Sequence, residues 1–139
     1  MKTLRQNQQG FTLLELLIAI SIFAIGLLSI AGMQITAIRT NSSANTLTAG
    51  SALAAGILEE VLAWPADEAP LTSNSSNNAW DFDPSKSSGS YSKFINGSGQ
   101  YTATYSVETN YGSADLSRIT VVVTGNGRTS TVVGFKRVL

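Results

Sequence analysis

The sequence of 139 residues contains no cysteine and no histidine. Without cysteine there is no disulfide framework, no thiolate metal site and no thiol nucleophile. Without histidine the chain lacks the commonest general base and the commonest metal ligand of proteins. The other residues form no serine triad, zinc pattern, phosphate-binding loop or glycine-rich dinucleotide turn. We therefore predict that the protein is not an enzyme and holds no metal or cofactor.

Charged residues are also scarce, at 13% of the chain, and the net formal charge is zero. A nucleic-acid-binding domain usually carries a basic surface, so this balance argues against a nucleic acid partner. If the first ten residues are removed, Lys2 and Arg5 leave with them and the remainder becomes mildly acidic. The length corresponds to one domain.

A long apolar run follows the polar start of the chain. Between Arg5 and Arg39 the only formal charge is Glu15, and residues 13–38 contain no proline. About 20 apolar residues suffice to cross a bilayer as a helix. Because the basic residues precede this run, the positive-inside rule keeps the N-terminus in the cytoplasm. We predict one membrane-spanning helix over residues 11–38, with the C-terminal part of the chain on the outer side.

Glu15 is the unusual residue of this helix. A carboxylate deep in a bilayer costs of order 2–4 kcal/mol on insertion scales. One interpretation is that Glu15 reaches the interface and favours the helix N-terminus. The other is that it awaits a cation from a partner, since an ionisable residue inside a membrane is a functional-site hypothesis by default.

The segment around this residue carries a resemblance. Its sequence, after a short leader, is Gly10-Phe11-Thr12-Leu13-Leu14-Glu15. It resembles the processing site of type IV pilins and pseudopilins. The resemblance implies that prepilin peptidase removes residues 1–10 by cleaving between Gly10 and Phe11, and that the new N-terminal Phe11 is methylated. It also implies that Glu15 pairs with the N-terminal amine of a neighbouring subunit, a pairing that avoids a stranded buried charge.

The resemblance also implies a setting and a set of partners. The subunit would be held in the bacterial inner membrane with its C-terminus in the periplasm, and an inner-membrane assembly platform would pack it with other pilin or pseudopilin subunits. The run IFAIGLLSIAGMQ at residues 22–34 is similar to a PilV-type minor pilin of the type IV pilus. Two alternatives remain: a minor pseudopilin of a type II secretion system, and a membrane-anchored periplasmic binding module that does not polymerise.

After residue 38 the apolar pattern becomes periodic. Apolar residues recur at spacings of three and four, which is typical of one helix face: Leu47, Leu53, Ala54, Ile57, Leu58, Val61 and Leu62. Pro65 ends the pattern, because the residue before proline disfavours helical angles. We predict a single helix over residues 11–63, softened near residues 40–45, whose amphipathic half at residues 39–64 needs a folded body to cover it.

Residues 65–100 are rich in serine, asparagine and glycine, which predicts a long loop. Four aromatic residues are expected to pin this loop to the body: Trp80, Phe82, Tyr91 and Phe94. Asp81 and Asp83 could suggest a cation site, but the calcium-loop pattern requires more acidic residues and a glycine at fixed positions. We interpret these two as solvated carboxylates.

From Tyr101 onward the sequence alternates with a period of two. Apolar residues at every second position predict strands over residues 101–108, 117–124 and 128–138. The pair Asn126-Gly127 between the last two is a signal for a type I′ hairpin turn. Three strands with one apolar face need a cover. The prediction for residues 65–139 is therefore a globular head, and the fold class is α+β: a long helix on a small antiparallel sheet of three or more strands, the lollipop that the pilin resemblance implies.

Overall fold

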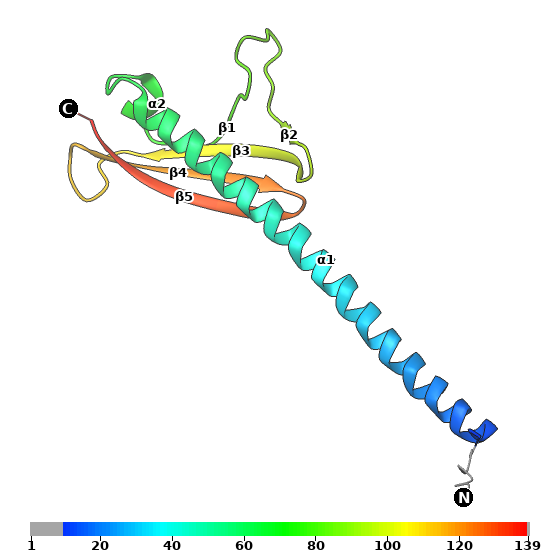
Figure 1. Ribbon diagram of the computed structural model, residues 1–139. Helices are drawn as coiled ribbons and strands as arrows, with labels where there is room; N and C mark the ends of the chain where they lie inside the picture. The colour runs from blue at the N-terminus through cyan, green and yellow to red at the C-terminus, as the bar shows by residue number, and fades with distance from the viewer. Residues whose placement is uncertain (1–9, 139) are drawn as a thin grey trace, which may run out of the picture. The chain divides into compact units, whose positions relative to one another are not determined.

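The computed structural model describes residues 10–138, so most of the predicted leader lies outside the described residues. Its elements are two helices and five strands, in the order α1 (Leu13–Ala63), α2 (Ala69–Thr72), β1 (Ser75–Ala79), β2 (Lys93–Ile95), β3 (Gly99–Glu108), β4 (Leu116–Gly125) and β5 (Arg128–Arg137) (Figure 1). The chain divides into two compact units, Met1–Thr40 and Asn41–Leu139. The predicted α+β fold class is confirmed.

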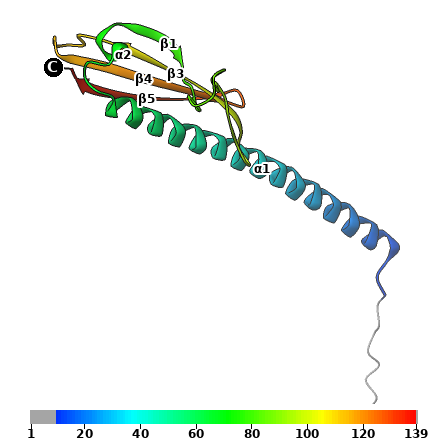
Figure 2. The ribbon, with the colours of Figure 1, turned by 90° about the horizontal axis from the view of Figure 1, so that it is seen from above.

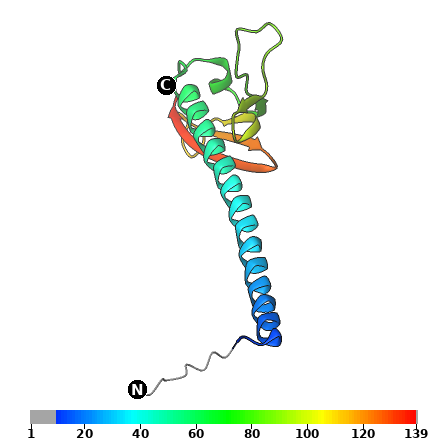
Figure 3. The same ribbon diagram turned by 45° about the vertical axis from the view of Figure 1, so that its right-hand side comes forward.

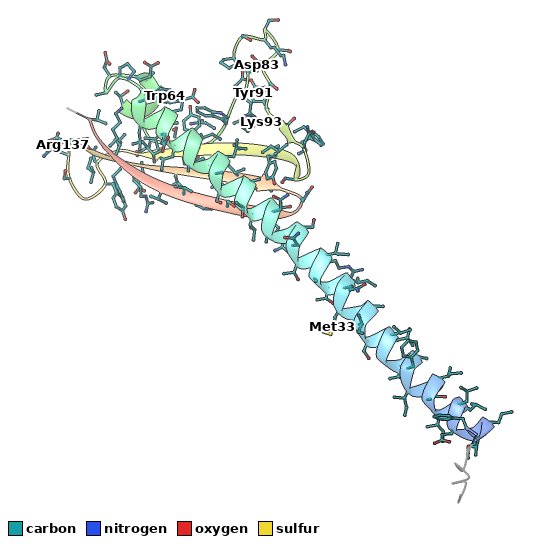
Figure 4. All side chains as sticks on the ribbon, viewed as in Figure 1. Met33, Trp64, Asp83, Tyr91, Lys93 and Arg137 are labelled. Atoms are coloured by element: carbon teal, nitrogen blue, oxygen red, sulfur yellow. The ribbon has the colours of Figure 1, made fainter. Side chains whose placement is uncertain are left out.

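The first unit contains the apolar part of α1. Residues 13–40 are helical throughout, and at 1.5 Å per residue they extend for about 40 Å. Their large apolar side chains are exposed, as Figure 4 illustrates for Met33. Within residues 10–138, α1 alone is long and apolar enough to cross a membrane. The exposed apolar surface is what a helix in contact with lipid or with other helices presents.

Three hydroxyl groups in this apolar stretch form hydrogen bonds within the helix itself. Ser21, Ser29 and Thr36 each donate to the carbonyl oxygen four residues earlier, at 2.8, 2.9 and 3.1 Å. This matters in an apolar environment, where an unpaired polar group costs several kcal/mol. These three hydroxyl groups are therefore compatible with a membrane-embedded helix.

The second unit is a two-layer structure in which residues 41–63 of α1 lie along one face of the sheet (Figure 2). The sheet is antiparallel with the strand order β1-β3-β4-β5. β2 also pairs with β3, at the first residues of β3. β1 and β2 therefore share the edge of β3 that faces away from β4. The three long strands β3, β4 and β5 match the predicted strands to within two residues.

The core lies between this part of α1 and the inner face of the sheet. The buried apolar residues come from the helix face at Ala54, Ile57, Leu58 and Val61, from α2 and the β1–β2 loop at Leu71 and Trp80, and from alternate positions of β3 and β4 at Tyr101, Ala103, Val107, Ile119, Val121 and Val123. The apolar residues that repeat every three to four positions in the helix and every two positions in the strands thus face the same core.

Residues 65–100 are less irregular than predicted. The interpretation of the serine- and asparagine-rich segment after residue 73 as a loop is wrong, because Ser75–Ala79 forms the edge strand β1. A polar edge strand needs few buried side chains, since its register comes from backbone pairing with β3. Side-chain bonds assist the pairing: the N–H of Asn77 donates to Ser106 Oγ, and the N–H of Thr109 donates to Asn74 Oδ1.

The predicted pinning of this segment by aromatic residues is only partly correct. Trp80 is buried and Phe82 packs against the core. Tyr91 and Phe94, by contrast, are 56% and 71% exposed. They lie in and after the β1–β2 loop, which stands out from the edge of the sheet in Figures 1 and 3. Tyr91 lies in the loop itself, and Phe94 lies on β2 beside Ile95, which packs against the core, so the ring of Phe94 points to the opposite face of the strand.

The hairpin between β4 and β5 has the predicted turn. Asn126 and Gly127 both have positive φ, 49° and 72°, as a type I′ turn requires. Just before the turn, Gly125 pairs with Tyr101 across the β3–β4 ladder. A Cβ atom at Gly125 would lie 2.3 Å from the ring of Tyr101, which is 1% exposed. The absent side chain is what leaves room for the ring in the core.

A Gly125→Ala variant is therefore expected to lower the free energy of unfolding by about 1–3 kcal/mol, the usual cost of overpacking a core. Denaturant unfolding of the full chain in a non-ionic detergent, followed by tryptophan fluorescence, measures the change. Gly56→Ala is the matched control. A Cβ there meets nothing within 4 Å, and alanine favours a helix over glycine by about 1 kcal/mol, so the control should gain stability. Equal losses in both variants would contradict the packing argument.

Lys136 on β5 links the C-terminal end of α1 to the sheet through hydrogen bonds. Its Nζ donates to the carbonyl oxygen of Leu62 at 2.6 Å and to that of Trp64. The last carbonyl groups of a helix have no partner within the helix, and a cation there also interacts favourably with the helix dipole. One side chain thus satisfies two acceptors at the point where the helix must stop.

We expect a Lys136→Met variant to lose about 1.5–3 kcal/mol of stability, the range for hydrogen bonds to a charged group. The same unfolding assay measures it. Arg137→Met is the control, because Arg137 is adjacent in sequence and exposed, as Figure 4 shows. A loss at Arg137 as large as that at Lys136 would remove the role assigned to the lysine.

Candidate processing and assembly site

The Gly10–Phe11 peptide bond, where the resemblance places cleavage, lies just before α1. Gly10 is exposed and nothing lies within 4 Å of where its Cβ would be. The side chain of Phe11 is 83% exposed. Neither residue is helical, because α1 begins at Leu13. The described residues thus leave this bond open to an approaching enzyme.

Thr12 caps the start of α1. The N–H of Glu15 donates to Thr12 Oγ1 at 3.3 Å, and the N–H of Leu16 donates to the Thr12 carbonyl oxygen at 3.2 Å. A threonine followed three residues later by glutamate is the capping-box pattern, in which each side chain bonds the other residue's backbone N–H. The sequence interpretation overlooked this spacing, although Thr12 and Glu15 display it directly.

Glu15 is thus both the third residue of a capped helix and the one acidic residue in a long apolar surface. Among the described residues, ion pairs join Lys86 to Asp83 and Arg118 to Glu108, and none involves Glu15. Its place in the first turn is favourable, because the helix N-terminus carries partial positive charge. The bond to Thr12 Oγ1 comes from the backbone N–H of Glu15, so this cap requires neither the charge nor the side chain of Glu15.

The two carboxylates considered as a cation site have protein partners instead. Asp81 Oδ1 accepts the N–H groups of Asp83 at 3.0 Å and Ser90 at 2.7 Å, which closes the loop between them. Asp83 accepts the Ser85 hydroxyl and pairs with Lys86 at 3.1 Å. Figure 4 shows Asp83 on this loop. Within residues 10–138, no group of three or more acidic residues lies close enough to hold a metal ion.

The contacts of Asp83 lower its pKa below the ordinary 3.8, first through the Ser85 hydroxyl and then through Lys86. Because the lowered pKa favours the charged form in the folded state, the stabilisation is present above pH 3.8 and is lost as the pH falls through the lowered pKa. The side chain is exposed, so this contribution is small.

The N-terminal part of the sequence matches the prokaryotic N-terminal methylation motif over residues 5–31. The match includes Gly10, Phe11 and Glu15 and ends within the apolar part of α1. No curated protein and no solved structure matches the chain. The assignment therefore stands on this motif together with the fold.

The motif implies processing by prepilin peptidase and assembly with other pilins, and the apolar start of α1 is consistent with membrane anchoring. A motif and fold of this kind point to a structural subunit. The N-terminal methylation motif, the long helix and the antiparallel sheet together support a type IV pilin-family protein.

Proposed function

We propose that the protein is a minor pilin, a structural subunit of a type IV pilus that serves pilus biogenesis, motility or adhesion. It enters the filament after cleavage between Gly10 and Phe11 and methylation of Phe11. The observation that carries the proposal is the apolar surface of α1 before residue 41, in which every side chain is exposed and Glu15 is the only charge before Arg39.

The physical basis of assembly is burial of this surface. A helix that is apolar on all sides is stable only in lipid or against other apolar helices. In the membrane the helix is stored in lipid; in a filament the same surface packs against related helices. The transfer exchanges one apolar environment for another, so packing and polar contacts decide the outcome.

Glu15 supplies such a polar contact. Cleavage after Gly10 creates a positively charged amine on Phe11, four residues from the carboxylate. When subunits pack side by side, the amine of one and the carboxylate of its neighbour neutralise each other in a medium where either alone is costly. This pairing fixes the axial register between neighbouring helices.

The anchoring follows from the same features. The basic residues Lys2 and Arg5 hold the leader in the cytoplasm, and the inner membrane takes up residues 11–38. The amphipathic part of the helix and the head at residues 65–139 then lie in the periplasm, next to the assembly platform. Leader removal leaves the anchor intact because the cut precedes the apolar segment.

A deletion strain tests the proposal. Pilin recovered in the sheared surface fraction and exoproteins secreted by the same culture are both measured. Loss of surface pili with normal secretion supports the minor pilin. Intact pili with failed secretion would replace it with the minor pseudopilin of a type II secretion system. A protein that retains its leader and leaves both processes unchanged would favour a membrane-anchored binding module.

A further inference from the structure

Three aromatic rings gather where α1 ends, away from the site described above. Trp64 follows the last residue of α1, Trp80 follows β1, and Tyr105 lies on β3. The two indole rings are 6.1 Å apart and nearly parallel, at 14°. The ring of Tyr105 stands edge-on to both, at 5.7 Å from Trp64 and 6.0 Å from Trp80. Residues 16 to 41 positions apart in the sequence are thus brought into one aromatic corner.

This corner lines a cavity of about 320 Å³. Ala79 and Pro84 add apolar wall, and the charged residues at the cavity are Glu60 and Asp81, both acidic. The volume lies at the lower end of the range for small-molecule pockets. Figure 4 shows Trp64 at the end of α1.

The charges of this cavity have the sign that suits a cation. Among the described residues, neither Glu60 nor Asp81 forms an ion pair. Lys93 lines a neighbouring cavity that shares Glu60 and Trp80, but it does not line this one. Lys136, which is near the helix end, is already bonded to backbone carbonyls. Asp81 Oδ1 accepts two backbone N–H groups, but neither Glu60 nor Asp81 is paired with one of these lysines.

Aromatic faces attract cations, and desolvated contacts of this kind contribute about 2 kcal/mol or more. Burial raises the pKa of Tyr105, so its ring stays a neutral phenol with a hydrogen to donate. Walls that are mostly aromatic and apolar favour a weakly hydrated cation over a small, strongly hydrated one, because less hydration is lost on entry.

We propose that the cavity lined by Trp64, Trp80, Tyr105, Glu60 and Asp81 binds an organic cation of the quaternary ammonium class. The rings hold the alkylated nitrogen through cation–π attraction, and the carboxylates at the cavity supply the opposite charge. This site does not depend on the proposed role in a pilus.

The chain offers a direct reporter, because Trp64 and Trp80 are its only tryptophans. Choline is titrated into the full-length protein in a non-ionic detergent while the tryptophan emission is recorded. Detergents with a phosphocholine headgroup are avoided, since they carry the probed group. Dimethylbutanol, in which carbon replaces the quaternary nitrogen, is the neutral control, and potassium chloride controls for ionic strength.

We expect saturable quenching or a wavelength shift with choline, and at least about tenfold weaker binding of dimethylbutanol. Equal responses to choline and dimethylbutanol would show an apolar pocket without selectivity for charge and overturn the proposal. A response to potassium chloride as large as that to choline, or no saturable response at all, would also overturn it. These comparisons need no variant, so they hold whether or not substitutions disturb folding.

Two neighbouring carboxylates provide a matched pair of variants. Glu60 lines the cavity whereas Glu59 does not, and both are exposed on α1. Glu60→Gln is expected to weaken choline binding about two- to fivefold, the effect of removing one exposed opposite charge. Glu59→Gln should leave it unchanged. Equal effects of the two substitutions would assign the attraction to net charge and not to this site.

Discussion

In a Glu15→Val variant, we expect normal leader removal and membrane insertion, with incorporation into surface filaments reduced by about a hundredfold or more. The reason is that the amine of the neighbouring subunit would be left buried and unpaired, and removing one partner of a buried pair costs roughly 3–5 kcal/mol. Insertion itself should improve slightly, because valine is favourable in a membrane helix. Incorporation is measured as the ratio of the variant in the sheared fraction to that in the membrane fraction.

A second substitution separates the two roles open to Glu15. Glutamine at this position keeps the polarity and nearly the size of glutamate but carries no charge. The bond from the N–H of residue 15 to Thr12 Oγ1 is a backbone bond that the substitution leaves in place. If Glu15→Gln fails to enter filaments as Glu15→Val does, the charge is essential and the pairing with an amine is supported. If Glu15→Gln enters normally, the charge is not needed, and the proposed role of Glu15 in setting the register between neighbouring helices is refuted.

Thr36→Val serves as the control for changing a polar residue of the same helix. The Thr36 hydroxyl donates to the carbonyl oxygen of Gly32 in its own helix, so it has no need of a neighbouring subunit. This variant should be incorporated nearly as well as the unaltered protein. A loss similar to that of Glu15→Val would indicate that any polar residue of the helix matters, and would weaken the special role of position 15.

The second large effect is expected at the leader. In a Gly10→Val variant, the mature fraction should fall at least about tenfold, which corresponds to about 1.4 kcal/mol in transition-state stabilisation. The physical reason is steric: Gly10 presents bare backbone to the peptidase, whereas valine adds a branched side chain beside the bond to be cut. Mass spectrometry of the purified protein distinguishes the full-length chain from one that begins at Phe11.

Gly32→Val is the matched control, since it makes the same change in the helix, where a Cβ meets nothing within 4 Å. It should be processed like the unaltered protein. A product beginning at Phe11 in normal yield from Gly10→Val would refute the assigned cleavage position. A product of the Gly10→Val variant that is uncleaved but still enters filaments would separate processing from assembly and contradict their proposed order.

The sequence alone determined the features that depend on local pattern. The apolar run from Leu13, whose only charge before Arg39 is Glu15, predicts a helix because no alternative satisfies its backbone in an apolar medium. The alternation after Tyr101 and the Asn126-Gly127 pair predict a hairpin because side-chain direction and φ are properties of a few neighbouring residues. The motif at Gly10 to Glu15 is likewise local, and it lies within residues 5–31, which match the methylation motif.

The tertiary structure decided what depends on distant partners. Ser75–Ala79 has no strand-like composition, and it is a strand because β3 offers it an unpaired edge. Trp80 is buried whereas Phe94 is exposed, although both are aromatic residues in a polar segment. Trp80 packs into the core, whereas Phe94 lies on β2 beside the core-packed Ile95 and therefore points to the opposite face of the strand. The meeting of Trp64, Trp80 and Tyr105 depends on how helix, loop and strand pack together. None of these contacts is predicted by the periodic spacing of residues. Periodicity reports which residues share a face of one helix or strand, whereas each of these contacts joins residues from different elements.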